Sequence, residues 1–163
     1  MTIIRVSVVG MTLDSATKSS LAKRLIEEFA TVEVGQFSEP ITAGFTLQLE
    51  EVAADSLWMG LKPVVQSHPS GKAVVISAQV MAGPWNAAMK EELFARLDAA
   101  VREILKIPKS DSGSNVWMTM TEIPGDSFSV GGKVVSIAHL SPFFTTDRQQ
   151  RVGEYVKKTK GSW

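Results

Sequence analysis

The sequence contains no cysteine, and histidine is also scarce. Without cysteine the chain has no disulfide, no thiolate metal ligand and no cysteine nucleophile. The two histidines, His68 and His139, lie far apart and neither stands at metal-ligand spacing from another candidate. The glycine-containing stretch GDSFSVGG is neither a G-x-S-x-G elbow nor a phosphate-binding loop. We therefore expect no metal and no cofactor.

An excess of charge of either sign is missing as well. Lys+Arg and Asp+Glu both number 17, so the formal net charge is zero, and nucleic-acid-binding and membrane-surface proteins usually carry a basic excess. We interpret the basic cluster at Lys157, Lys158 and Lys160 as the solvated end of a helix. No apolar run reaches membrane-spanning length, and MTIIRVSVVG at the start is typical of a strand and not of a signal peptide. We predict a cytoplasmic protein with no nucleic-acid and no membrane partner.

What the sequence does contain is an internal repeat. DSLWMGLKPVV at 55–65 returns 71 positions later as DSFSVGGKVVS at 126–136, with five identities in eleven positions. Upstream, the apolar stripe of the predicted helix at 13–29 matches that at 85–101, with an offset of 72. Apolar residues recur every fourth position in both, which indicates one buried face on each helix. Asp14 and Asn86 stand where an N-cap acceptor is expected.

Each copy therefore consists of a strand, a helix, a second strand and a hairpin. The first strands are predicted at 3–9 and 73–81, and the second strands alternate within 44–52 and 114–123. We predict a single α/β domain over 1–163 with repeats at 2–65 and 73–137 and an extension at 138–163. In this fold two β-α-β units share a four-stranded sheet with both helices on one face. The ferredoxin-like fold has the same element order, but there another strand separates the two strands of each unit.

The second repeat, above all TEIPGDSFSVGG, resembles the tautomerase superfamily of the 4-oxalocrotonate tautomerase type, in its fused (tandem) form. The resemblance covers nearly all of 2–137 and implies a homotrimer in which the open face of the sheet is buried. It also implies an N-terminal proline whose amine, kept neutral in an apolar pocket, acts as general base. Two arginines are expected to bind the carboxylates of the substrate.

The sequence departs from this pattern at the positions that carry the chemistry. Thr2 occupies the position of the proline. Leu13 and Trp85 occupy the first arginine position in the two repeats, and Thr46 and Trp117 the second. We therefore expect a tautomerase-like protein whose keto–enol activity is weak or lost. The alternative is an active tautomerase of a small 2-oxo or 2-hydroxy-dienoic acid that uses its N-terminal amine as the base.

Five residues are candidates for the site. Thr2 is the candidate for the catalytic position, and Arg5, Trp85, Trp117 and Phe128 are candidates for binding a small carboxylate ligand. Arg5 has a second interpretation as an ion-paired side chain on the sheet, and the three aromatic residues have one as subunit packing. In the extension we expect a short helix to about Lys158, docked on its own trimer by aromatic side chains.

Overall fold

The computed structural model describes residues 1–109, 115–124 and 127–160. Its central sheet has the strand order β2-β1-β5-β6. The strands are β1 (Thr2–Val9), β2 (Phe45–Val52), β5 (Ala73–Met81) and β6 (Val116–Ile123). β1 pairs with β2 in parallel, β5 pairs with β6 in parallel, and β1 and β5 are antiparallel. The predicted fold is confirmed, and the ferredoxin-like arrangement is excluded because no strand separates the two strands of either unit.

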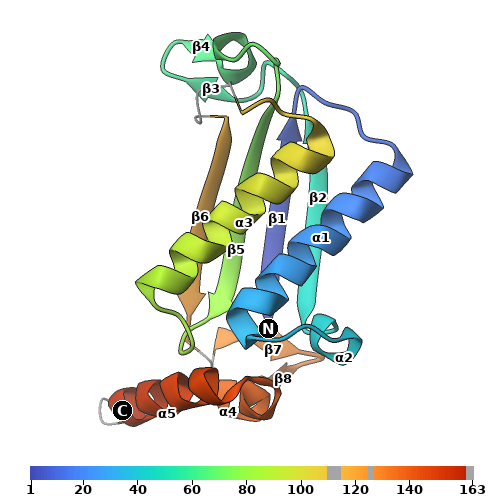
Figure 1. The fold of residues 1–163 in the computed structure, drawn as a ribbon. Helices are drawn as coiled ribbons and strands as arrows, with labels where there is room; N and C mark the ends of the chain where they lie inside the picture. The colour runs from blue at the N-terminus through green and yellow to red at the C-terminus, as the bar shows by residue number, and fades with distance from the viewer. Residues whose placement is uncertain (110–114, 125–126, 161–163) are drawn as a thin grey trace.

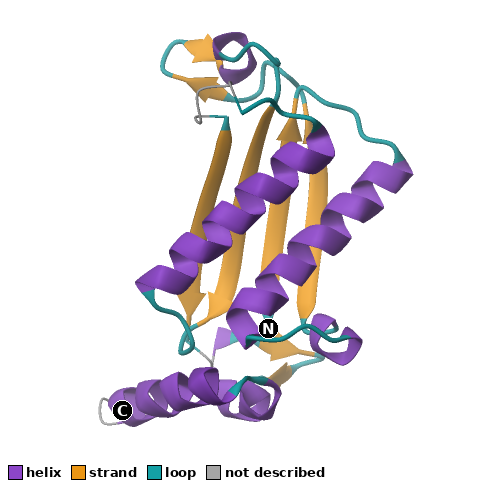
Figure 2. Ribbon diagram, in the orientation of Figure 1, coloured by secondary structure: helices purple, strands orange, loops and turns teal. Residues whose placement is uncertain are grey.

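Both long helices, α1 (Ser15–Val34) and α3 (Ala87–Leu105), cover the same face of this sheet (Figure 1, Figure 2). Each begins at the polar side chain expected from the sequence. The Asp14 carboxylate accepts a hydrogen bond from the Thr17 amide at 2.6 Å, and the Asn86 side chain accepts one from the Met89 amide at 2.9 Å. These bonds satisfy amides that have no partner within the helix.

The core lies between the two helices and the sheet. Alternate residues of β1 and β5 point into it, and all of them are less than 5% exposed: Ile4, Val6, Val8, Ile76, Ala78 and Val80. The helices contribute the apolar stripes seen in the sequence, including Leu21, Leu25, Leu93 and Leu97. The opposite face of the sheet carries polar residues such as Arg5, Gln48 and Thr119, and none of the helices in the described parts of the chain covers it (Figure 1).

Residues identical in the two repeats form equivalent ion pairs. Lys18 Nζ lies 2.8 Å from a carboxylate oxygen of Glu51, and Lys90 Nζ lies 2.6 Å from one of Glu122. Each pair joins the first turn of a helix to the C-terminal end of the strand that follows it. The sequence identities therefore mark the same contact in both units.

Two hairpins lie at opposite ends of the sheet (Figure 1). In the first hairpin, β3 (Trp58–Met59) pairs with β4 (Lys62–Pro63), and the 3₁₀ turn η1 (Val64–Ser67) follows. In the second, β7 (Ser129–Val130) pairs with β8 (Lys133–Val134). Gly131 and Gly132 have φ of 57° and 76°, the left-handed region that a two-residue hairpin turn requires. Leu57, just before the first hairpin, packs in the cluster of Val9 and Ala73, and Phe128, just before the second, packs in the cluster of Met1 and Met81.

The C-terminal extension consists of α4 (Ile137–Leu140), the 3₁₀ turn η3 (Ser141–Phe143) and α5 (Thr146–Lys160). It docks on the end of α1 in the same chain. The Thr145 amide donates to the Val34 carbonyl at 3.0 Å, and the Gln36 side chain donates to the Phe143 carbonyl at 2.8 Å. Across the described ranges, none of the helices has the length and apolar character needed to cross a membrane.

Candidate functional site

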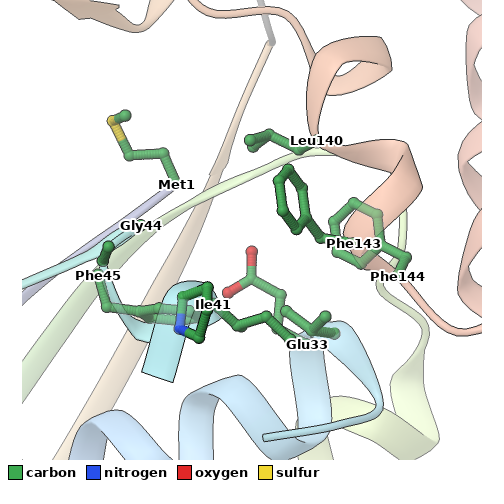
Figure 3. Close-up of a pocket in the computed structure, with 11 residues that line it drawn as sticks. Met1, Glu33, Ile41, Gly44, Phe45, Leu140, Phe143 and Phe144 are labelled. Atoms are coloured by element: carbon green, nitrogen blue, oxygen red, sulfur yellow. The ribbon is translucent and has the colours of Figure 1, made fainter. Parts of the chain in front are cut away.

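A cavity of about 280 Å³ lies at the beginning of β1, where four parts of the chain meet (Figure 3). They are the last turn of α1, the short helix α2 (Glu39–Thr42), the beginning of β2 and the C-terminal extension. The lining is mostly apolar and consists of Met1, Glu33, Val34, Pro40, Ile41, Ala43, Gly44, Phe45, Leu140, Phe143 and Phe144. The cavity thus combines segments that are more than a hundred residues apart in the sequence.

One polar side-chain pair lies at this cavity. Thr2 is fully buried and Glu33 is 2% exposed, and the Thr2 hydroxyl donates to Glu33 Oε2 at 2.6 Å. Glu33 is buried because it continues the apolar stripe of α1, four residues after Phe29. Its carboxyl group points into the space between Ile41, Phe143 and Met1 (Figure 3). A buried, hydrogen-bonded carboxyl group therefore faces an otherwise apolar cavity.

Burial shifts both ionisable groups at this site toward their neutral forms. Burial raises the pKa of Glu33, and this effect outweighs the opposing influence of the Met1 amine and of the Thr2 hydrogen bond. Burial also lowers the pKa of the Met1 amine, against the attraction of Glu33. Loss of water disfavours a charge on either group, which explains both directions. Burial therefore opposes the charged form of both groups, and their mutual attraction acts against this effect of burial.

The cavity offers little to an anionic ligand. Among the described residues that line it, none is Lys, Arg or His, and Glu33 is the single residue with an ionisable side chain. Carboxylates are usually held by charge-assisted bonds from Arg or Lys. Within the described parts of the chain, no three His, Asp or Glu residues come together as a metal site. The chemistry available here is hydrogen bonding and proton exchange at one carboxyl and one amine, within apolar walls.

The predicted site residues lie in different places. Thr2 is at the cavity through its bond to Glu33, and Phe128, 5% exposed, packs in the same cluster as Met1. Arg5 lies on the opposite face of the sheet, because residues 3 and 5 of β1 point away from residues 2 and 4. There it lines a shallow depression with Ser77, Gln79 and Thr121 among others.

Neither of the two predicted tryptophans lines the cavity. Trp85 precedes α3 and packs against the main core, and its indole nitrogen is buried without a hydrogen-bond partner among the described residues. Trp117 lies in β6 and packs with Val9 and Val64, near the other hairpin. The structure therefore places Thr2 beside the cavity and Phe128 in the cluster that contains Met1, whereas Arg5, Trp85 and Trp117 belong to neither.

The residue that sequence reasoning missed is Glu33. The signal was present, because Leu21, Leu25 and Phe29 recur every fourth residue and the next position of that stripe is a glutamate. In the second repeat the same position, 72 residues later, is Leu105. A charged residue on a buried helical face is a candidate functional group.

The fold has clear relatives among solved structures. A fused 4-OT forming a symmetric trimer matches with a TM-score of 0.65 and 20% identity over 84% of this chain and 98% of that one. A native fused 4-OT matches with a TM-score of 0.64 and 22% identity, over 81% and 94% of the two chains. N1, a member of the cis-3-chloroacrylic acid dehalogenase (cis-CaaD) family, matches with a TM-score of 0.67 and 18% identity, over 93% and 99%.

At the level of sequence, no protein-family model matches the chain, and a comparison with curated proteins finds no match. The structural likeness extends over more than four fifths of this chain and nearly all of each neighbour. The chain therefore has the fold of the fused 4-OT and cis-CaaD-family proteins.

Proposed function

We propose that the protein is a tautomerase-superfamily member whose keto–enol tautomerase activity toward small 2-oxo acids is weak or lost. The observation that carries this proposal is the composition of the cavity at the beginning of β1. Thr2 occupies the position of the catalytic proline, and its hydroxyl is committed to Glu33. No basic side chain stands among the described residues that line the cavity.

The expected loss of activity follows from the missing charges. A charge-assisted hydrogen bond is worth about 1.5–3 kcal/mol, so two absent arginines remove several kcal/mol of transition-state binding. Each 1.4 kcal/mol is a factor of ten in rate, which makes a loss of at least a hundredfold the natural expectation. The carboxyl of Glu33 adds repulsion to an anionic substrate whenever it is ionised.

One observation favours the alternative, an active tautomerase that uses its N-terminal amine as the base. Burial lowers the pKa of the Met1 amine, and a neutral amine is the form that accepts a proton. If Met1 is removed, the amine of Thr2 takes its place, about 3.3 Å further along the strand. This candidate therefore depends on which residue is the first of the mature chain.

We propose a homotrimer as the assembly. Fused 4-OT neighbours are described as symmetric and asymmetric trimers. The hairpins carry exposed apolar side chains suited to a subunit contact, namely Trp58, Met59, Leu61, Val130 and Val134. Sedimentation should return a trimer at micromolar concentration, and a clean monomer would contradict it. The cytoplasmic location, the repeat boundaries, and roles for Arg5, Trp85 and Trp117 in ligand binding stay predictions.

The test combines intact mass, which shows whether Met1 is present, with enol–keto assays on 2-hydroxymuconate and phenylenolpyruvate. We expect turnover near the uncatalysed background. Robust turnover that disappears on N-terminal acetylation would overturn the proposal in favour of the amine base. Thr2→Pro, prepared with Met1 removed, restores the base without restoring the arginines. It should therefore raise the rate only slightly.

A further inference from the structure

We infer that the cavity beside Glu33 binds a small, apolar, uncharged carbonyl compound and that the Glu33 carboxyl donates a hydrogen bond to its carbonyl oxygen. This inference rests on the proposed function, because it takes the same cavity as the site and a neutral ligand in place of a 2-oxo acid. It adds the class of ligand and the residue that recognises it.

The first argument is the direction of the carboxyl group. Thr2 donates to Oε2 of Glu33, and the carboxyl faces the cavity between Ile41 and Phe143 (Figure 3). A carboxyl with one oxygen held by a hydroxyl is fixed in orientation and still has a second oxygen for a ligand. Burial raises the pKa of Glu33, which shifts this carboxyl toward the protonated form that can donate.

The second argument is the other unit of the same chain. An offset of 72 places Val74 where Thr2 stands and Leu105 where Glu33 stands, and these two are 0% and 4% exposed. The fold thus accommodates two apolar side chains at the equivalent point. Burying a polar pair is costly and gives little net stability. The presence of the pair in the unit that forms the cavity therefore indicates binding and not folding.

The third argument is electrostatic. An anionic ligand would enter a cavity whose described lining has no basic side chain and one carboxyl. A cationic ligand would require an ionised Glu33 as its partner, and the burial that raises the pKa of Glu33 opposes that ionisation. A neutral ligand avoids both penalties, since apolar walls stabilise it by burial and the carboxyl satisfies its oxygen.

The fourth argument is size. About 280 Å³ lies just below the usual range for ligand pockets and corresponds to roughly nine or ten water volumes. A compound of about ten non-hydrogen atoms fits this space. 1-Phenylpropan-2-one has this size and is neutral. Phenylacetate has the same shape with a negative charge, and 2-phenylethylammonium supplies the positive charge on nearly the same skeleton.

The experiment measures the affinity of the full chain for these three probes at neutral pH by chemical-shift titration. The variants are Glu33→Gln, which keeps the shape and a donor, and Glu33→Leu, which copies Leu105 of the other unit. Glu27→Gln, on the same helix and ion-paired with Lys23, is the matched control. Circular dichroism and thermal unfolding establish that each variant is folded.

We expect the wild type and Glu27→Gln to bind 1-phenylpropan-2-one about tenfold or more tightly than either charged probe. Glu33→Gln should keep that affinity within about threefold, and Glu33→Leu should lose about tenfold. The inference is overturned if the ketone does not bind, if either charged probe binds equally well or better, or if Glu33→Leu binds the ketone unchanged. Phenylenolpyruvate turnover, measured separately, decides the proposed function, so the two can fail independently.

Discussion

The two β-α-β units of this chain differ most where the first strand of each unit meets the end of its helix. In the N-terminal unit Thr2 and Glu33 form a buried hydrogen bond beside a cavity. In the C-terminal unit Val74 and Leu105 occupy those positions and belong to the continuous apolar core. Both units place a first strand beside the end of a helix, and they differ in the side chains there and in what covers them, which in the N-terminal unit includes α2.

What covers the two helix ends also differs. The end of α1 is overlaid by the C-terminal extension, which bonds to Val34 and places Phe143 and Phe144 in the cavity wall. Hydrogen bonds hold the end of α3 instead. Lys72 donates to the Leu105 carbonyl at 2.8 Å, and Arg102 donates to Asp98 and to Asn115. The cavity at Glu33 therefore depends on the N-terminal unit and the extension, and Leu105 at the equivalent position offers no carboxyl.

The largest expected effect comes from removing the anchor of the extension. Phe144 is 5% exposed and packs in the cluster that includes Met81 and Phe128. Phe144→Ala should lower the free energy of unfolding by about 3–5 kcal/mol, because it loses apolar burial and leaves a void. Denaturant unfolding measures this change. Phe143→Ala is the control, since Phe143 is 49% exposed, and an equal loss in both variants would contradict the packing described.

Removing one member of the polar pair is expected to have the next largest effect. Thr2→Val keeps the shape of the side chain but leaves the buried Glu33 without its donor, at a cost of about 1–3 kcal/mol. The reciprocal change, Val74→Thr, places a hydroxyl in apolar surroundings and should cost a similar amount. Thermal unfolding compares the two variants. If Thr2→Val unfolds at the same temperature as the wild type, the Thr2–Glu33 hydrogen bond does not stabilise the folded state.

The third prediction concerns pH. Because the pKa of Glu33 is raised in the folded state, the folded protein binds this proton more tightly than the unfolded one. The contribution of Glu33 to stability is therefore fully present below its ordinary pKa of 4.5 and is lost as pH rises through the higher folded value. The lowered pKa of the Met1 amine acts in the opposite sense, with stability rising toward pH 8.0.

Comparison with Glu33→Gln isolates the carboxyl. As pH rises above 4.5 the wild type should lose stability relative to Glu33→Gln in urea unfolding, and Glu27→Gln should follow the wild type. Parallel curves for the wild type and Glu33→Gln would mean that the pKa of the carboxyl is the same in the folded and unfolded states.

The smallest effect is predicted where the two units are alike. Lys18–Glu51 and Lys90–Glu122 are partly exposed ion pairs, so Lys18→Met and Lys90→Met should each change stability by only about 0.2–1 kcal/mol. The two changes should also be equal within error in thermal unfolding. A large difference between them would show that the units are not equivalent at this contact.

The sequence allowed the fold to be predicted because its signals were local and repeated. Asp14 and Asn86 marked the helix starts, and the stripe of each helix marked its buried face. The repeat then determined which strands are neighbours. The helix starts and the apolar stripes depend only on hydrogen bonds and periodicities within single helices.

The candidate site was less accessible from sequence, because its parts are distant in the chain. Glu33 meets Thr2 from 31 residues away, and Phe143 reaches the cavity from an extension outside the repeat. Arg5 was grouped with Thr2 by proximity in sequence, yet the alternation of a strand puts the two on opposite faces. Thr2 was predicted at the site, whereas its partner Glu33 was missed although it continues the apolar stripe of α1.

The most direct test of the central claim, that the Thr2–Glu33 pair serves binding and not folding, is the double variant Thr2→Val/Glu33→Leu. It gives the N-terminal unit the side chains of the C-terminal unit. Unfolding free energy and affinity for 1-phenylpropan-2-one are measured on the same sample. We predict stability within about 1 kcal/mol of the wild type, or above it, and an affinity at least about tenfold weaker. A variant that loses several kcal/mol of stability, or binds the ketone as the wild type does, would contradict the account.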